Sequence, residues 1–579
     1  MKIYLIIILT LCLNLSISLD KTTNIGEIKF KLKKYSSSEH FKINLNTKKH
    51  KEKLSHENLL NRNSIIEIKP NYIITGIKWK KIDNYKKNVI EWHSKIGYLL
   101  GVFEGSNDES FMDGTPIAIL KEQLLSKNVN YIHLNSSKSY KYIRYIPPNK
   151  NNSSIIPLKI FGYKQSSKLK NSDDDEYYYQ ITNLPLVTIH TEDDIEPNKE
   201  SDINCYIKIV NEGKLVNNEE AKIKVRGRSS SMVPTKKPYR IKFSTKQKIL
   251  NFEGKEKKWT LIANYFDRSL LRNNLAFKIS ELLNFPFTPR CHPVDVVLNG
   301  NFRGNYYICD KIEVGNNRVN ITKMDKSEIY DPNITGGYLL EIDAMSTFYQ
   351  GNSFTTDKGI VGNIEYPKED EITLEQKSYI ISKLNQFEDE IYNNNLDSID
   401  LNSYSKYFLV EEFCGDPDHV WSSFYFTKER NDDKFYFGPV WDFDLAFDND
   451  YRLIPTNNKT DFCFYYCSSA GTTKEFLKVL IGNKNVIGYI KKTWEELCNT
   501  VLNQNVLVDY IEEVRQYIKD SAELNFLRWD NDEDFTPSSM DFGRDENFED
   551  SVEIVKEYDK GRFASLSNLI DNSTQSLDN

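Results

Sequence analysis

The sequence predicts an α+β fold in more than one domain, and three observations carry this prediction. The chain of 579 residues is too long for one small domain, so two or three units are expected. Hydrophobic residues make up 39% of the chain and aromatic residues 13%, which is enough to build a large core. Strand-like apolar runs dominate up to residue 343, whereas helical periodicity dominates from residue 374 onward.

The first residues, MKIYLIIILTLCLNLSISLD, are typical of a targeting segment. Lys2 provides the positive start, Ile3–Leu13 the short apolar stretch, and Ser16 and Ser18 the small residues for cleavage. The apolar run is too short to span a membrane comfortably, and the C-terminus has no hydrophobic tail for a lipid anchor. We therefore predict a signal peptide over residues 1–18 and a secreted protein without a transmembrane segment.

Glycosylation triplets and cysteines agree with a secreted chain. Acceptor triplets Asn-x-Ser/Thr begin at Asn135, Asn151, Asn152, Asn320, Asn333, Asn458 and Asn572. Of the 8 cysteines, Cys12 lies in the predicted signal peptide, so an odd number remains and one thiol is expected to be free or intermolecular. Cys463 and Cys467 could close a small disulfide or pair elsewhere, and no Cys/His spacing indicates zinc.

Two regions precede the main part of the chain. Residues 19–63 are rich in Lys and Asn with little apolar periodicity, so they are predicted to be a leader or linker; a basic ligand-binding arm is the alternative. Residues 64–180 recover strand-like runs such as YIITGIKW, PIAIL and YKYIRYI. This second region is therefore predicted to be a β-rich accessory region.

The main unit is predicted over residues 184–560, followed by a tail over 561–579. LVTIHTED, CYIKIV, AKIKVRG, PYRIKF and GGYLLEID indicate strands. Asp267 is expected to cap the helix of DRSLLRNNLAFKISELL. VDVVLNGNFRGNYYI predicts a hairpin that turns at Asn299 and Gly300, because this dipeptide favours tight hairpin turns.

The second half of this unit is more helical. Helices are predicted over 374–392 and 403–415, the second ending at a glycine. The polar loop DPDHVWS follows, and SFYFTKE and KFYFGPVW then form a hairpin. Residues 451–560 are mostly helical in pattern, and the acidic stretch 529–550 is predicted to be a solvated loop.

Four aspartates stand directly behind the strand FYFGPVW: Asp442, Asp444, Asp448 and Asp450. Such like charges repel one another unless a cation lies among them. The order of a basic strand, a helix, a hairpin, a loop aspartate, a second hairpin and WDFD is that of a phosphoryl-transfer site built in two lobes. Asp418, in the loop, and Asp442 are separated by a hairpin-length segment, as a catalytic and a metal-binding aspartate would be.

Five motifs occur in an order that carries this interpretation further: RGRSS…KKPYRIKF (226–243), LIANYFDRSLLRNNLAF (261–277), PVDVVLNGNFRGNYYICDKIEVGNNRVNI (293–321), GYLLEID (337–343) and FYFGPVWDFDLAF (435–447). Together they resemble the CotH family, the spore coat protein H kinases, which are secreted or coat-associated atypical protein kinases. The resemblance runs from about residue 185 to 450 and leaves residues 20–180 outside it.

This resemblance implies an atypical, two-lobed protein-kinase-like fold and an enzyme that uses ATP and Mg²⁺ or Mn²⁺. It implies transfer of phosphate to hydroxyl side chains of extracellular or coat proteins. By the same resemblance Asp442 binds the metal, with Asp444 as supporting ligand; on an extended backbone both carboxylates would face one side. The catalytic aspartate lies in the 416–418 loop, where Asp418 is preferred to Asp416 because Pro417 fixes the loop before it.

Basic residues around the PYRIKF strand are candidates to bind the phosphates of ATP, namely Arg226, Lys237 and Lys242. Each of them could equally be an ordinary surface charge. Strand alternation places Lys242 on the face opposite to Tyr239 and Ile241, hence toward a cleft or solvent if those two face the core.

Several alternatives stay open. Ordinary kinases place a metal-binding Asn five residues after the catalytic Asp, where this chain has Ser423, and RGRSSS is the nearest approach to a Gly-rich loop. An inactive kinase-like module with an adhesion or scaffold role is therefore the alternative. A glycosidase or phosphoesterase with paired carboxylates is another, as is a structural calcium ion at the aspartates. The net charge of −7 gives no indication of a nucleic-acid partner.

Four neighbouring residues have simpler explanations. Trp441 is predicted to fill the core beside the site, and His419 to be an ordinary loop histidine. Asp448 and Asp450 are predicted to lie in a solvated loop rather than to bind metal.

Overall fold

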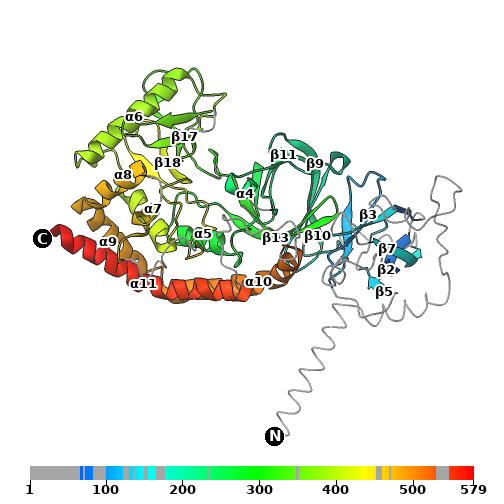
Figure 1. The fold of residues 1–579 in the computed structure, drawn as a ribbon. Helices are drawn as coiled ribbons and strands as arrows, with labels where there is room; N and C mark the ends of the chain where they lie inside the picture. Colours follow the sequence, from blue (N-terminus) through cyan, green and yellow to red (C-terminus); the bar gives the residue numbers. More distant parts are fainter. Residues whose placement is uncertain are drawn as a thin grey trace, which may run out of the picture. The chain divides into compact units, whose positions relative to one another are not determined.

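The computed structural model describes residues 65–68, 72–82, 99–121, 130–134, 138–148, 154–164, 177–232, 235–346, 351–450, 460–467, 471–529 and 547–578 (Figure 1). The predicted signal peptide (1–18) and leader (19–63) lie outside these residues. Contacts divide the chain into two units, Met1–Tyr179 and Gln180–Asn579.

The first unit is built from two small antiparallel sheets, as the prediction of a β-rich N-terminal region requires. One sheet has the order β1 (Ile66–Glu67), β6 (Tyr142–Ile146), β3 (Val102–Ser106), β4 (Thr115–Ile119); the other has the order β5 (Asn130–His133), β2 (Tyr72–Ile82), β7 (Ser154–Lys164). Strand β7 is not among the strand-like runs named from the sequence. Ile77, Trp79 and Ile143 are buried and form part of the core of this unit.

The second unit begins with a closed seven-stranded barrel. Its order is β10 (Lys214–Val225), β11 (Tyr239–Gln247), β12 (Glu256–Ile262), β14 (Asn301–Asp310), β13 (Cys291–Leu298), β8 (Leu186–Thr191), β9 (Ile203–Asn211). Only β13 and β8 pair in parallel within it. Tyr239, Ile241 and Phe243 of β11 are buried in the barrel core, as strand alternation predicts, and Lys242 points outward.

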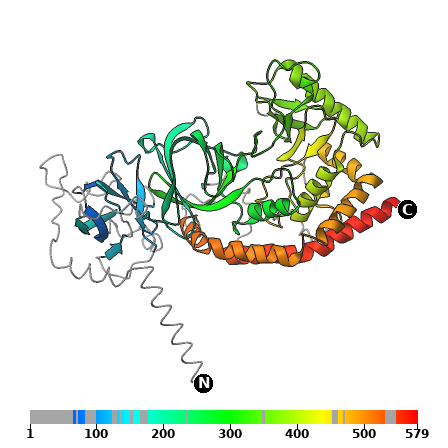
Figure 2. The ribbon, with the colours of Figure 1, turned by 180° about the vertical axis from the view of Figure 1, so that it is seen from behind.

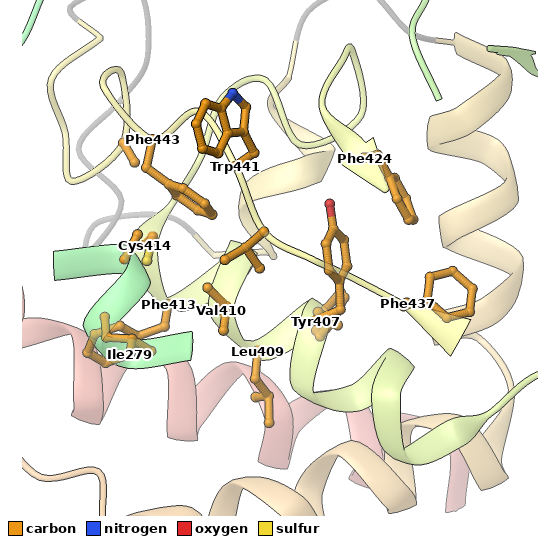
Figure 3. Packing of buried hydrophobic residues seen from close by; sticks show 14 of the residues in the cluster. Ile279, Tyr407, Leu409, Val410, Phe413, Cys414, Phe424, Phe437, Trp441 and Phe443 are labelled. Carbon is orange, nitrogen blue, oxygen red and sulfur yellow. The ribbon is translucent and has the colours of Figure 1, made fainter. Parts of the chain in front are cut away.

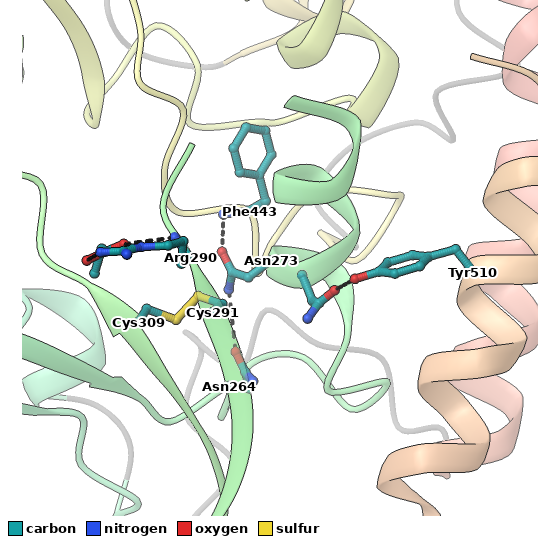
Figure 4. The surroundings of a disulfide bond; sticks show 9 residues. Asn264, Asn273, Arg290, Cys291, Cys309, Phe443 and Tyr510 are labelled. Carbon is teal, nitrogen blue, oxygen red and sulfur yellow. Dashed lines mark hydrogen bonds and ion pairs between the residues drawn. A yellow bond between two sulfur atoms is a disulfide. The ribbon is translucent and has the colours of Figure 1, made fainter. Parts of the chain in front are cut away.

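The hairpin predicted around Asn299 and Gly300 is confirmed as β13 and β14. Both turn residues have positive φ, 50° and 73°, which is the backbone that this dipeptide tolerates. Cys291 and Cys309 face each other across the two strands and form a disulfide (Figure 4).

The rest of the unit combines a five-stranded sheet with helices around one large apolar core. The sheet has the order β16 (Ser353–Thr355), β17 (Val361–Tyr366), β15 (Tyr338–Ile342), β18 (Phe424–Lys428), β19 (Phe435–Phe437). The helices are α4 (Ser229–Met232), α5 (Arg272–Leu282), α6 (Leu374–Tyr392), α7 (Leu401–Cys414), α8 (Gly471–Ile481), α9 (Lys484–Cys498), α10 (Gln504–Trp529) and α11 (Phe548–Asp578). In both views α10 and α11 lie along one side of this unit, and α10 contacts barrel strand β14 (Figure 2).

The helical predictions agree closely with these bounds. Helix α6 begins after a capping box formed by Thr373 and Gln376, so its start is encoded locally. Helix α7 ends at Gly415, whose left-handed conformation closes the helix as a C-cap glycine does. The predicted tail continues α11 instead, and Leu566 and Ile570 are buried there.

The α+β class is confirmed. The two-lobed kinase-like arrangement stays a prediction. The barrel is a feature that this prediction did not include. Among the described residues, no helix combines the length and the apolarity needed to cross a membrane.

Candidate active site

The loop that carries WDFD is held by the start of α5. The backbone N–H of Phe443 donates to the Asn273 side-chain oxygen at 2.8 Å (Figure 4). The Arg272 Nε donates to the carbonyl of Ala446 at 3.1 Å. The Asn449 side chain donates to the carbonyl of Phe266 at 2.8 Å. The motif at 261–277 therefore fixes the position of the aspartate loop through these three hydrogen bonds.

Asp267 has a different role from the predicted helix cap. The N-cap position of α5 is Leu271, whose side chain makes no capping bond. The Asp267 carboxylate instead accepts the Arg272 backbone N–H at 2.8 Å and forms an ion pair with the same guanidinium at 2.5 Å. Both side chains are buried, so this pair fixes the start of α5 against the loop.

Asp442 and Asp444 lie close enough to influence each other, although the backbone between them is not extended. Asp442 has φ of 77°, so the expectation of an extended backbone is wrong at this position. As whole residues, Asp442 is exposed and Asp444 half-buried, but neighbouring atoms crowd both carboxyl groups enough to desolvate them. Desolvation, followed by the charges of Asp442 and Asp418, raises the pKa of Asp444 well above its usual value.

The loop after α7 brings a second pair of aspartates to the same place. The Asp418 backbone N–H donates to the Asp416 carboxylate at 3.2 Å. Asp416 is buried and Asp418 half-buried, so Asp418 is the more accessible of the two. Desolvation, then the charges of Glu411, Asp418 and Asp442, raises the pKa of Asp416 well above its usual value. The 416–418 loop and the 442–444 loop therefore lie close together.

Glu411 is a site residue that the sequence reasoning missed. Its carboxyl group lies beside Asp416 and Tyr407, and desolvation raises its pKa to about 8. Because the carboxyl groups of Glu411 and Asp416 interact closely, their protonation is a property of the pair. The signal was present in the run FLVEEFC, where two acids interrupt an otherwise apolar helix end.

Two arginines lie among these carboxylates. Arg226 and Arg228 follow β10 on either side of Gly227, whose φ of 86° favours glycine. The Arg226 guanidinium lies 5.5 Å from the centre of the Trp441 ring, and Arg228 forms an ion pair with Asp343. Desolvation raises the pKa of Asp442, and the charges of both arginines oppose that rise.

The acidic set extends to the end of β15. Desolvation and the charge of Glu365 raise the pKa of Glu341 to about 7, and Arg228 lowers it. The GYLLEID motif therefore supplies carboxylates that share an arginine with the WDFD loop, a connection that could not be read from sequence separation.

The predicted lysines lie differently. Lys237 donates to the carbonyl of Ser231 at 2.8 Å, and Lys242 is exposed on the outside of the barrel between Lys222 and Lys258. Within the described residues, no hydrogen bond or ion pair joins either lysine to the aspartates of the 416–418 and 442–444 loops. Their role toward ATP stays a prediction.

Lys236, which the sequence reasoning passed over, is buried. Its Nζ donates to the carbonyl of Ala263 at 2.6 Å, to that of Asn305 at 2.5 Å and to the Asn525 side chain at 2.8 Å. This lysine therefore joins the barrel to α10.

Three simpler expectations can be compared with the structure. Trp441 is buried and stacks on Phe277, as expected of a core residue; Figure 3 shows Trp441 beside the apolar residues of α7. His419 is a loop residue, but it is buried among aromatic rings, and desolvation lowers its pKa to about 3. The solvated-loop expectation is wrong for Asp450, which is 4% exposed, while Asp448 is half-buried.

The aspartates fit a hard divalent cation. Mg²⁺ prefers oxygen ligands and is commonly held by one or two carboxylates together with phosphates and water. The charge of Asp442 raises the proton affinity of Asp444, a cost that a bound cation would remove. Among the described residues no group of three or more His, Cys, Asp or Glu side chains is arranged to hold a metal, so phosphate and water oxygens would have to complete the shell.

Comparison with known proteins places the chain in a family. The model of the CotH kinase protein family matches residues 223–566, which is more than half of the chain, so the chain belongs to this family. Membership indicates a CotH-like kinase and, in general, use of ATP and a divalent metal. No curated protein matches the chain.

One similar solved structure is CBM62 from Clostridium thermocellum Xyl5A, at 21% identity and a TM-score of 0.12. The match covers 16% of this chain and 60% of that chain. Such a TM-score does not indicate a common fold.

Proposed function

We propose that this protein is a secreted, CotH-like atypical protein kinase that transfers phosphate from ATP to hydroxyl side chains of extracellular or coat proteins. The observation that carries this proposal is the convergence of two aspartate loops, 416–418 and 442–444, beside Arg226 and Arg228. Family membership supports it independently.

The transfer assigns a role to each loop. An acceptor hydroxyl oxygen bonds to the γ-phosphorus of ATP while the bond from that phosphorus to the β–γ bridging oxygen breaks, releasing ADP. The hydroxyl proton passes to Asp418, the more accessible carboxylate of its loop. Asp416 accepts the Asp418 backbone N–H and so holds that loop in place.

Charge around the phosphates comes from both sides of the site. Asp442 and Asp444 would hold Mg²⁺ or Mn²⁺, whose positive charge would offset the charge of the phosphates. The charges of Arg226 and Arg228 both act on the carboxyl group of Asp442. These two arginines are therefore better placed than Lys242 to bind phosphate oxygens.

Secretion rests on three supporting features. The N-terminal residues are typical of a signal peptide, and the Cys291–Cys309 disulfide suits an oxidising compartment. The acceptor asparagines Asn320, Asn333 and Asn572 are exposed, as glycosylation requires.

A catalytically inactive scaffold is the second candidate. Ser423 stands where ordinary kinases have a metal-binding Asn, and Arg228 already pairs with Asp343. An inactive module would keep its fold without needing ATP.

The test is autophosphorylation of the purified full chain with γ-labelled ATP, with and without Mg²⁺ or Mn²⁺. We expect metal-dependent labelling that Asp418→Asn abolishes. Asp433→Asn, a change of an exposed aspartate in the β18–β19 turn, is the matched control and should label normally. Absence of labelling of the wild type and of added protein acceptors, with intact folding, would favour the scaffold.

A further inference from the structure

Two cysteines lie next to the backbone of Asp416. Cys463 begins a short 3₁₀ turn, and Cys467 follows its end. Both are buried, with exposed fractions of 1% and 2%. Each Sγ lies 3.9 Å from the carbonyl oxygen of Asp416, and the Cys467 Sγ lies 3.6 Å from the carbonyl oxygen of Cys463. They are therefore neighbours that share one acceptor.

The turn that carries them is attached to α7. The Glu412 carboxylate accepts the backbone N–H of Cys463 at 2.5 Å and that of Phe464 at 3.0 Å. Arg562 of α11 donates to the Glu412 carbonyl, at 3.0 Å from its Nε. Because these groups are buried, the position of the turn relative to the end of α7 is well defined.

We propose that Cys463 and Cys467 form a disulfide in the mature protein, and that this disulfide braces the turn against the backbone of Asp416. The proximity of the two sulfur atoms makes the bond possible, and the shared carbonyl connects it to the candidate catalytic loop. The inference takes only its oxidising setting from the proposed secretion, and the bond itself does not depend on kinase activity.

The oxidation balances as a thiol–disulfide exchange with a small disulfide such as oxidised glutathione. One cysteine, as thiolate, attacks the oxidant and forms a mixed disulfide, releasing one glutathione. The second thiolate then attacks the protein sulfur and releases the other glutathione. The two cysteine protons end on the released glutathione thiols, and the two electrons reduce the oxidant.

Burial decides when this exchange can take place. The neighbouring Cys463 side chain, and then desolvation, raise the pKa of the Cys467 thiol, so the folded turn holds little reactive thiolate. The exchange therefore belongs to folding, or to a local opening of the turn. After Cys12 is set aside, two disulfides would leave Cys205, Cys414 and Cys498 as thiols, which is three where the sequence predicted one.

The first experiment maps the bond directly. The full chain is incubated with oxidised glutathione, denatured, alkylated without reduction, digested and analysed by mass spectrometry. We expect a Cys463–Cys467 peptide that lacks two hydrogens and carries no alkyl group, with Cys498 alkylated. Alkylation of both Cys463 and Cys467 while Cys291–Cys309 stays linked would overturn the proposal, as would a bond from either one to Cys414.

The second experiment measures the brace by hydrogen exchange of the backbone amides in residues 411–418. The Cys463→Ser/Cys467→Ser protein should exchange about tenfold faster there than the oxidised wild type, because the turn loses its cross-link. Cys498→Ser is the matched control and should exchange like the wild type. Equal protection in the wild type and the double variant would overturn the brace. Neither experiment uses ATP, so failure here is distinct from failure of the kinase proposal.

Discussion

The side chain of Ser423 lies beside the carboxyl group of Asp442 and favours its ionised form. Ser423 is the residue that departs from ordinary kinases, which have a metal-binding Asn at this position. In this chain the shorter side chain opposes the rise of the Asp442 pKa that desolvation causes. If the site binds a metal, Asp442 would contribute to that binding without the second ligand that the Asn provides in ordinary kinases.

Ser423→Ala should move the acid limb of the pH–rate profile upward. The Ser423 hydroxyl favours the ionised form of Asp442, so its removal raises the pKa of a carboxyl that is already raised. Because metal binding needs the ionised form, activity at low pH falls first, and the acid limb moves to higher pH. The measurement is kcat/KM against pH, and Ser422→Ala is the neighbouring control. An unchanged limb would mean that Asp442 does not control it.

Arg226→Ala should weaken ATP binding by about tenfold, because one charged contact to phosphate is lost from a partly desolvated site. Lys242→Ala should bind ATP like the wild type, since Lys242 lies exposed on the outside of the barrel. Calorimetric titration of both variants with Mg²⁺–ATP measures this. A loss confined to Lys242→Ala would restore the sequence-based assignment of the phosphate contact.

These lysines show how far the sequence could predict the structure. Alternation along PYRIKF predicted that Ile241 is buried and Lys242 points away, because period 2 is a local property of a strand. Lys236 and Lys237 stand in a Pro-flanked loop without periodicity, so nothing local distinguishes the buried lysine from its neighbour. The closure of the barrel, which pairs β8 with β13 across about a hundred residues, is likewise set by tertiary contacts.

The same division applies to the candidate site. The order of motifs predicted that Asp418 and Asp442 belong together, and their loops do converge. Glu411 and Arg228 were missed because their importance depends on what lies opposite them in space. Gly415 could be predicted as the end of α7 because a C-cap glycine is again a local feature.

Lys236→Met should destabilise the protein by about 3 kcal/mol, because three buried oxygen atoms would each lose a donor while most of the packing volume is kept. Lys237→Met, beside it, should cost less than about 1 kcal/mol, since Lys237 is half-buried with one carbonyl partner. Urea unfolding of both variants provides the comparison. Equal losses would show that the bonds of Lys236 contribute little to stability.

Glu411→Gln should flatten the dependence of stability on pH. The folded protein raises the pKa of Glu411 from 4.5 to about 8, so the folded state binds a proton that the unfolded state releases. The stabilisation is complete below the unfolded pKa and is lost as pH rises toward 8, by up to about 1.4 kcal/mol per pH unit. Urea unfolding in EDTA at several pH values between 5 and 8 measures the slope. A slope that the substitution leaves unchanged would place the proton elsewhere.

Asp442→Asn distinguishes a catalytic metal from a structural one. The change keeps the shape of the side chain and removes the charge that a divalent cation needs, so autophosphorylation should fall at least about a hundredfold. In EDTA the variant should melt about 2 °C higher than the wild type, because one charge is gone from a set of carboxylates that raise one another's pKa.

A structural calcium ion predicts the opposite pattern for the same protein. In that case the wild type would gain stability with calcium, EDTA would lower its melting temperature, and Asp442→Asn would be the less stable protein at saturating calcium. Melting temperature and labelling are therefore measured together in EDTA, in calcium and in Mg²⁺–ATP. Asp433→Asn controls for the loss of any surface carboxylate. If Asp442→Asn labels itself at the wild-type rate, Asp442 does not hold the metal of phosphoryl transfer.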